Sequence, residues 1–229
     1  MKEKLIWIAL DGPAGSGKST IASKLLNYLN NFIYVNTGAM YRSLAYFLLQ
    51  KNVNPNLESS VKDALDDFHV NLEHNQVYLI IDNKKIDITS EIYNEKIAKL
   101  ASDVSQFSCV RDKLIAEQRL IANNNNVVMD GRDIGTVVLP DATLKIYLDA
   151  SIRKRAERRY KQINCLDSDE TIETISYEIM KRDQADKNRE LGALKQADDA
   201  ILITTDNLTV DECCQKIIHL LDEKLKQVN

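Results

Sequence analysis

The stretch Gly12-Pro13-Ala14-Gly15-Ser16-Gly17-Lys18-Ser19 decides the fold of this 229-residue chain. It satisfies the pattern G-x-x-x-x-G-K-[S/T] and lies between an apolar run, Leu5–Leu10, and a helical stretch, Lys18–Leu29. Glycines let successive backbone N–H groups turn inward, and the following helix directs its positive end at the same anion. Lys18 can then reach the β- and γ-phosphates, and Ser19 can ligate Mg²⁺. The pattern predicts a loop over residues 12–20, ending at Thr20, that binds the phosphates of a nucleotide.

Strands and helices alternate outward from this loop, which predicts an α/β fold with a central parallel sheet flanked by helices in three layers. The middle of the chain differs, because short extended runs separated by polar turns predict an antiparallel meander. The predicted strands are Leu5–Leu10, Phe32–Val35, Val127–Met129, Leu144–Leu148 and Ile201–Ile203, with Phe68–Leu72, Val77–Asp82 and Lys85–Ile88 in the meander. The predicted helices are Lys18–Leu29, Ala39–Gln50, about 91–106, 108–122, two starting near 151 and 169, and Val210–Lys226.

Composition narrows the classes of function. The net charge is −4, so the chain offers no overall attraction to nucleic acid. The four cysteines match no zinc or redox spacing, and they favour a reducing cytoplasm. The run Leu5–Leu10 is shorter than a signal peptide or a membrane span requires. No apolar stripe is left over for a partner. We therefore expect a cytoplasmic monomer that binds neither nucleic acid nor membrane.

A second motif lies where the strand Val127–Met129 ends in Asp130, the place of an acid that orients Mg²⁺ or its waters. It continues as Gly131-Arg132-Asp133-Ile134-Gly135. The phosphate loop alone does not distinguish small kinases, motor ATPases and switch GTPases. The segment Asn83–Asp87 imitates the guanine motif N-K-x-D but is one residue too long, so we interpret it as a turn.

Together these segments resemble the bacterial cytidylate kinases along almost the whole chain. The similar segments, in order, are Gly12–Thr20, Asn36–Arg42, Asp130–Val138 with Pro140-Asp141-Ala142, Arg155–Tyr160 and Arg182–Arg189. The resemblance implies ATP-dependent, Mg²⁺-dependent phosphorylation of CMP and dCMP. It also implies one nucleoside monophosphate kinase domain, 1–229, with a core at 1–62 and 107–229, a monophosphate-binding insert at about 63–106 and a helical lid at about 153–170.

The resemblance also implies roles for single residues. Lys18 and Arg132 are catalytic, Arg42 and Arg132 grip the acceptor phosphate, and Arg189 assists with phosphates. Arg182 and Asp186 contact the ribose, although an i, i+4 pair on a helix is more often a surface ion pair. The cytosine pocket consists of Thr37, Ser102, Arg111 and Asp133, with Tyr41 near it. Tyr93 and Ser108 depart from the family, which has Arg and Pro at these positions.

The basic segment Arg153–Lys161 contains six cations and would ordinarily be a solvated helix face. Its position after the strand Leu144–Leu148, and before a hinge-like loop at Cys165–Asp169, favours the lid instead. Arg155 and Arg159 lie four residues apart and should point the same way. We expect these two, with Arg158 as a further candidate, to stabilise charge on the transferred phosphoryl group.

The predicted reaction needs no general base, because the acceptor is already a phosphate oxygen with a second pKa of about 6. Accordingly His69, His74 and His219 lie near no motif. Two alternatives remain open. One is another small-molecule kinase with this loop, for UMP, dephospho-coenzyme A or shikimate. The other is a non-enzymatic nucleotide-binding switch.

Overall fold

The computed structural model describes residues 5–73, 76–81, 83–163 and 171–228. The chain forms two compact units. The first unit comprises Met1–Phe32 and Asn126–Asn229, and the second comprises Ile33–Asn125. The predicted insert, 63–106, lies within the second unit, and the exact boundaries of the core, insert and lid stay predictions.

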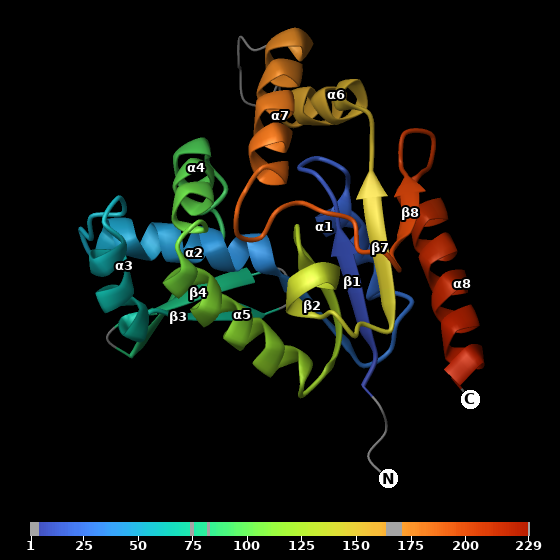
Figure 1. The fold of residues 1–229 in the computed structure, drawn as a ribbon, viewed down its shortest axis with the longest axis horizontal. Coiled ribbons are helices and arrows are strands. Elements are labelled where there is room, and N and C mark those ends of the chain that lie inside the picture. The colour runs from blue at the N-terminus through green and yellow to red at the C-terminus, as the bar shows by residue number, and fades with distance from the viewer. Residues whose placement is uncertain (1–4, 74–75, 82, 164–170, 229) are drawn as a thin grey trace. The chain divides into compact units, whose positions relative to one another are not determined.

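A parallel sheet forms the centre of the first unit (Figure 1). Its strands lie in the order β6 (Asn126–Asp130), β1 (Trp7–Asp11), β7 (Leu144–Asp149) and β8 (Ile201–Thr204). Along β1, Leu10 pairs with Asp130 on one side and with Ile146 on the other. Ile8, Ala9 and Leu10 are fully buried, as expected for a strand that helices cover on both faces. The parallel α/β fold predicted from the alternation is confirmed.

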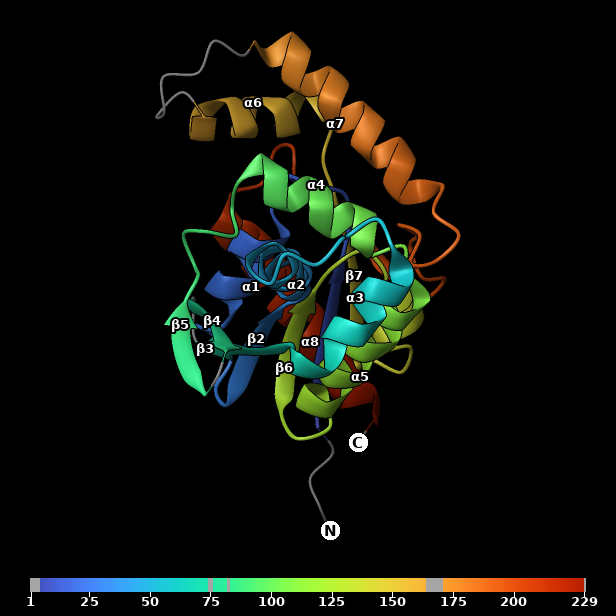
Figure 2. The same ribbon diagram turned by 90° about the vertical axis from the view of Figure 1, so that its left-hand side faces the viewer.

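Helices follow the strands of the first unit as the sequence predicts. Helix α1 (Lys18–Leu25) contacts α8 (Val210–Val228), whose adjacent Cys213 and Cys214 are both buried. Helix α6 (Ile152–Ile163) packs against α7 (Ile172–Lys187), and Figure 2 shows the two together. The hinge-like loop predicted at Cys165–Asp169 lies outside the described residues.

The second unit contains the predicted antiparallel meander. Strands β3 (His69–Glu73), β4 (Gln76–Ile81) and β5 (Lys84–Asp87) pair in that order. Helix α2 (Thr37–Gln50) follows β2 (Phe32–Asn36), and it packs on α4 (Glu95–Val104), α5 (Ser108–Ala122) and β4. In the core of this unit, the ring centres of Phe47 and Phe68 lie 5.6 Å apart. The meander predicted from the short extended runs is confirmed.

Several elements differ from the prediction. Helix α1 ends four residues early, where Asn27 and Tyr28 close turns onto Lys24 and Leu25. Helix α3 (Glu58–Ala64), with the 3₁₀ turn η1 (Leu65–Asp67), was not predicted, and neither was the π-helical turn η2 (Ile134–Val138). Such short helices carry too little periodicity to be visible in a sequence.

Within the described residues, none of the helices combines the length and the apolar content that crossing a bilayer requires.

The backbone around Gly12 leaves no room for a side chain at this position. The φ of Gly12 is +145°, and a Cβ at this position would lie 2.0 Å from the carbonyl oxygen of Leu148 on β7. That contact is with backbone, so relief requires β1 and β7 to move apart.

We therefore expect Gly12→Ala to lower the free energy of unfolding by about 2 kcal/mol or more, through strain and disrupted strand pairing. The measurement is thermal melting of both proteins. Gly38→Ala is the matched control, because a Cβ there meets no atom closer than 3.4 Å. A Gly12→Ala protein that melts with the wild type would show that the sheet yields easily.

Candidate active site

The phosphate loop joins β1 to α1, as its motif predicts. Lys18 is the first residue of α1, and its Nζ donates to the carbonyl oxygens of Gly12 and Pro13, each at 2.7 Å. The side chain is buried, and burial, followed by the charge of Arg132, holds the pKa of Lys18 well below its usual value. A bound phosphate would reverse both effects, because an anion beside the ammonium favours its protonated form.

Ser19 and Asp130, the two residues predicted to hold the metal, lie together. The Ser19 Oγ donates to Oδ2 of Asp130 at 2.9 Å. Hard oxygen donors of this kind suit Mg²⁺, which typically takes one or two protein ligands and completes its shell with phosphate oxygens and water. Elsewhere in the described part of the chain, no three His, Cys, Asp or Glu side chains gather closely enough to hold a metal. The pair fits an ion shared with a nucleotide.

The turn Gly131–Gly135, which carries Arg132 and Asp133, is fastened to the end of β1. The Gly131 N–H donates to the carbonyl oxygen of Leu10 at 3.0 Å. The N–H groups of Ile134 and Gly135 donate to the two oxygens of Asp11 at 2.8 and 2.7 Å. Since Gly12 follows Asp11 directly, one carboxylate holds the turn Gly131–Gly135 against the start of the phosphate loop.

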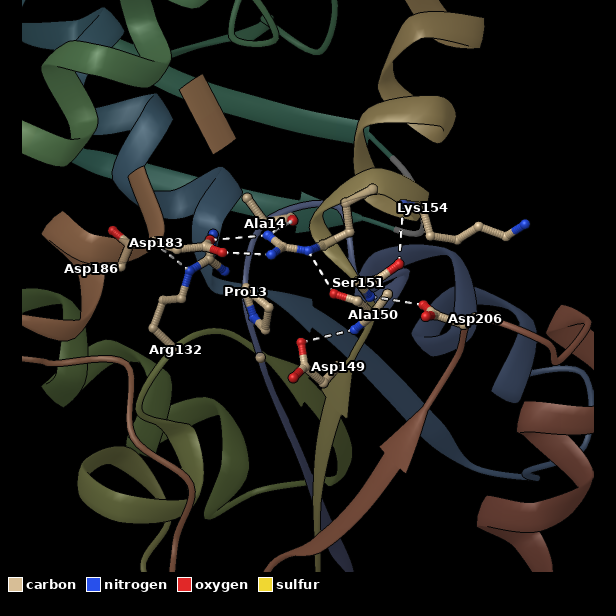
Figure 3. A network of polar contacts seen from close by, with 12 residues as sticks. Pro13, Ala14, Arg132, Asp149, Ala150, Ser151, Lys154, Asp183, Asp186 and Asp206 are labelled. Carbon is tan, nitrogen blue, oxygen red and sulfur yellow. Dashed lines mark hydrogen bonds and ion pairs between the residues drawn. The ribbon is translucent and has the colours of Figure 1, made fainter. Parts of the chain in front are cut away.

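Arg132, Asp186 and Arg189 form an ion cluster (Figure 3 shows Arg132 and Asp186 facing each other). The Nε of Arg132 lies 2.9 Å from Oδ2 of Asp186, and Nη2 of Arg189 lies 2.8 Å from Oδ1. Burial alone would raise the pKa of Asp186, but the charges of Arg132 and Arg189 outweigh it, and the pKa is lowered. The carboxylate is therefore ionised at neutral pH. The charge of Arg182 adds to this effect.

The basic residues of α6 divide into two sets. Arg153 and Lys154 form surface ion pairs with Glu157. Arg155 is buried and Arg158 is half-buried, and both contact the phosphate loop: Nη1 of Arg155 donates to Ala14 O at 3.2 Å, and Nη1 of Arg158 donates to Gly15 O at 3.3 Å. Arg159 is exposed on the same helix, so it does not share the environment of Arg155. The charge-stabilising roles of Arg155 and Arg159 stay predictions.

The remaining predicted residues belong to the second unit. Thr37 begins α2, whose N-terminus is capped by Asn36 accepting from the N–H of Ala39 at 2.9 Å. Arg42 lies on α2 with its guanidinium 4.8 Å from the centre of the Tyr93 ring, and its buried Nε has no hydrogen-bond partner among the described residues. Ser102 lies on α4, and Arg111 is buried on α5. Helices α2, α4 and α5, which carry these residues, pack together through α2.

Both departures from the family pattern have a local explanation. Ser108 is the first residue of α5, a position where proline is favoured because its missing N–H would bond nothing in the helix. Serine satisfies the same position, and its Oγ lies 3.4 Å from Oε1 of Glu58. Tyr93 supplies an aromatic face for the guanidinium of Arg42, a favourable cation–π arrangement.

Sequence reasoning missed three residues that support the site. Asp11 ends its apolar strand in a carboxylate, as Asp130 does, and that parallel is a signal that could have identified it. Asp183 pairs with Arg155, and its signal is its place within the segment Arg182–Arg189. Thr205 is buried and donates to the Ser16 carbonyl oxygen at 3.1 Å, and nothing in the sequence marks it.

Asp11 predicts a pH effect on stability. The pKa of Asp11 is raised to about 6, because loss of hydration, with a smaller contribution from the charge of Asp133, outweighs the opposing effects of the two N–H groups and of Lys18. In the unfolded chain the pKa is about 3.9, so between these values the folded protein binds more protons. The contribution of Asp11 to the free energy of unfolding is thus larger near pH 4 and declines as the pH rises through 6.

We expect the melting temperature of the wild type minus that of Asp11→Asn to shrink as the pH rises from 4.5 to 7, by the equivalent of about 2 kcal/mol. Asp141→Asn, at an exposed carboxylate, is the control and should leave the pH profile unchanged. A gap between wild type and Asp11→Asn that is constant with pH would contradict the raised pKa.

Comparisons with known proteins identify the family of this chain. Residues 8–223 match the family model described as cytidylate kinase. A cytidylate kinase of Halalkalibacterium halodurans is 40% identical over 95% of this chain and 98% of its own length. One of Thermotoga neapolitana is 42% identical over 96% and 98%. An uncharacterised protein of Eubacterium ventriosum has the same fold, with a TM-score of 0.53 at 15% identity over 96% of this chain and 99% of its own. The chain thus belongs to the cytidylate kinase family.

Proposed function

We propose that this protein transfers the γ-phosphoryl group of ATP to CMP, and to dCMP, giving ADP and the corresponding diphosphate in pyrimidine nucleotide metabolism. One observation carries the proposal: Asp11 joins the start of the phosphate loop to the turn that bears Arg132 and Asp133. Donor and acceptor phosphates would then be bound by one continuous framework. The names of the relatives support the choice of CMP.

The ATP half consists of residues 12–20. Backbone N–H groups of the loop and the N-terminus of α1 bind the phosphates, and Lys18 leaves its carbonyl partners for the β- and γ-phosphates. Ser19 and Asp130 would hold Mg²⁺ or its waters. The ion, when bound, neutralises charge on the phosphate oxygens.

The acceptor half is proposed from the roles that the family resemblance implies for single residues. Arg42 and Arg132 bind the CMP phosphate, because a planar guanidinium matches phosphate oxygens in pairs. The buried Arg42 Nε, which has no hydrogen-bond partner within the described part of the chain, supports this role. Asp186 accepts hydrogen bonds from the ribose hydroxyls and Arg182 donates to their oxygens, since each carboxylate oxygen has more than one acceptor position and can bind a hydroxyl beside its arginine. Arg189 assists with the phosphate.

Catalysis consists of alignment and neutralisation of charge. The acceptor phosphate is largely a dianion at neutral pH, so no residue has to remove a proton. Lys18 and Arg132 stabilise the phosphoryl group in transit, together with Arg159 of the lid segment, whereas Arg155 is paired with Asp183 and contacts the phosphate loop. Closure of the lid excludes water, which would otherwise hydrolyse ATP.

The alternatives are less well supported. A kinase for UMP, dephospho-coenzyme A or shikimate would share the loop but should lack the Asp130–Gly135 block. A nucleotide switch would need a proper guanine motif. We further infer a cytoplasmic monomer that binds neither membrane nor nucleic acid. The net charge of −4 and the free thiols of Cys109, Cys213 and Cys214 support this inference.

Lys18→Met tests the ATP half. Loss of a preorganised cation at the transferred group should lower kcat by a factor of about 100 or more while the fold persists. The measurement is ADP release with CMP at saturating substrates. Lys24→Met is the matched control, because Lys24 lies on the same helix but pairs with Asp211 at the surface. Normal turnover in Lys18→Met would contradict the assignment of the loop.

Asp133→Ala tests base recognition, which we assign to Asp133 and Arg111 with Thr37 and Ser102. Cytosine presents a donor at its amino group and an acceptor at N3, whereas uracil reverses both. An ionised carboxylate only accepts and a guanidinium only donates, so the pair matches cytosine. Each such contact discriminates by about 1–3 kcal/mol, and CMP should exceed UMP in kcat/KM by about tenfold or more.

In Asp133→Ala the ratio of kcat/KM for CMP to that for UMP should fall towards unity, with dCMP following CMP. Asp141→Ala, at an exposed carboxylate after the same block, should preserve the ratio. If CMP and UMP lose equally in Asp133→Ala, then Asp133 orders its turn and does not contact the base.

A further inference from the structure

All three nitrogen atoms of the Arg155 guanidinium donate hydrogen bonds within the first unit. Its Nε donates to Ala150 O at 2.9 Å, at the end of β7. Its Nη1 and Nη2 donate to the two oxygens of Asp183 on α7 at 3.0 and 2.6 Å. Nη1 also donates to Ala14 O of the phosphate loop at 3.2 Å. Figure 3 shows Asp183 beside Ala14, with Ala150 below them.

Asp183 sets the orientation of the Arg155 guanidinium. A two-point contact fixes the plane of the guanidinium as well as its distance, and the Arg155 side chain is only 4% exposed. Because Nη1 is shared between Asp183 and Ala14, the carboxylate and the loop carbonyl are held by one rigid group. We call Arg155 and Asp183 the loop clamp.

The loop clamp also contacts Gly15. The φ of Gly15 is +77°, and a Cβ built there would lie 3.3 Å from Cβ of Arg155. The aliphatic stem of Arg155 therefore packs directly on the tip of the phosphate loop. Ala14 and Gly15 belong to the segment whose N–H groups bind phosphate. Their positions depend on where Arg155 is held.

Helix α7 connects the clamp to the acceptor residues. Asp186 lies three residues after Asp183, so the two carboxylates share a face of α7. Asp183 pairs with Arg155 of the loop clamp, whereas Asp186 pairs with Arg132 of the turn Gly131–Gly135. One helix face thus anchors both halves of the site within the first unit.

We propose that Asp183 is a positioning residue for ATP: through Arg155 it fixes Ala14 and Gly15 in the conformation that binds the nucleotide phosphates. The proposal rests on the proposed function for the identity of the nucleotide. Its competitor is that Asp183 withholds a catalytic Arg155 until the lid closes. The two hypotheses predict different results for the loss of Asp183: the first predicts weaker binding of ATP, and the second predicts faster turnover.

The test is Asp183→Asn, which keeps the shape of the side chain but loses the charge and one acceptor oxygen. We expect the Kd for MgATP, measured by calorimetry without CMP, to rise about tenfold, in line with the loss of a charge-assisted bidentate contact. The KM for CMP should change less than twofold. Glu178→Gln, which removes an exposed charge from the same helix, should change neither constant.

A double-mutant cycle with Arg155→Lys separates positioning from general destabilisation. Lysine keeps the charge but cannot bind Asp183 and Ala14 together. If Asp183 acts through Arg155, the double variant should bind MgATP as tightly as whichever single variant has the lower affinity. Asp183→Glu, which restores the carboxylate, should recover most of the wild-type affinity. Additive losses, or an increase in kcat with unchanged Kd in Asp183→Asn, would overturn the proposal.

If Asp183→Asn fails to fold, the Kd for MgATP is measured in Arg155→Lys and Asp183→Glu instead. The binding measurement contains no acceptor, so it is independent of whether CMP is the substrate. Wild-type protein that binds MgATP but does not phosphorylate CMP would contradict the proposed function and leave the loop clamp intact. Wild-type affinity for MgATP in both single variants would overturn the clamp and leave the proposed function intact.

Discussion

The carboxylate of Asp11, which accepts the N–H groups of Ile134 and Gly135, is the contact on which the rest of the site in the first unit depends. It ends the central strand and immediately precedes the phosphate loop. Two short hydrogen bonds, both accepted by the Asp11 carboxylate, fix the position and the direction of the turn that carries Arg132. A carboxylate suits this place because each oxygen accepts one backbone donor. The cost is a buried charge, visible in the raised pKa of Asp11.

Three cations of the site are engaged by oxygen atoms of the protein. Lys18 donates to loop carbonyls, Arg132 pairs with Asp186, and Arg155 pairs with Asp183. Buried positive charges without partners would destabilise the fold by several kcal/mol. These partners restrict the long side chains to defined positions. Little ordering of long side chains is then needed on binding.

The strands, the loop and the antiparallel meander could be predicted because each has a strong local pattern: buried apolar runs, glycine spacing, or polar turns between short strands. Helix α3 and the turn η2 could not, since each is too short to show a period. The environment of Arg155 was also hidden. Helical spacing places Arg155 and Arg159 on one face, but it does not reveal that Asp183, from a separate helix, buries Arg155 and leaves Arg159 exposed. Tertiary partners decide such cases.

The register of β1 has a consequence for the order in which the chain folds during synthesis. Ile6 bonds to Asn126, 120 positions later, and β7 follows further along the chain. The first unit therefore cannot complete its sheet until most of the protein has been made. The second unit is one continuous segment, Ile33–Asn125, and leaves the ribosome before β6. Until then β1 has no neighbouring strand in its sheet, and its apolar side chains stay exposed on the nascent chain.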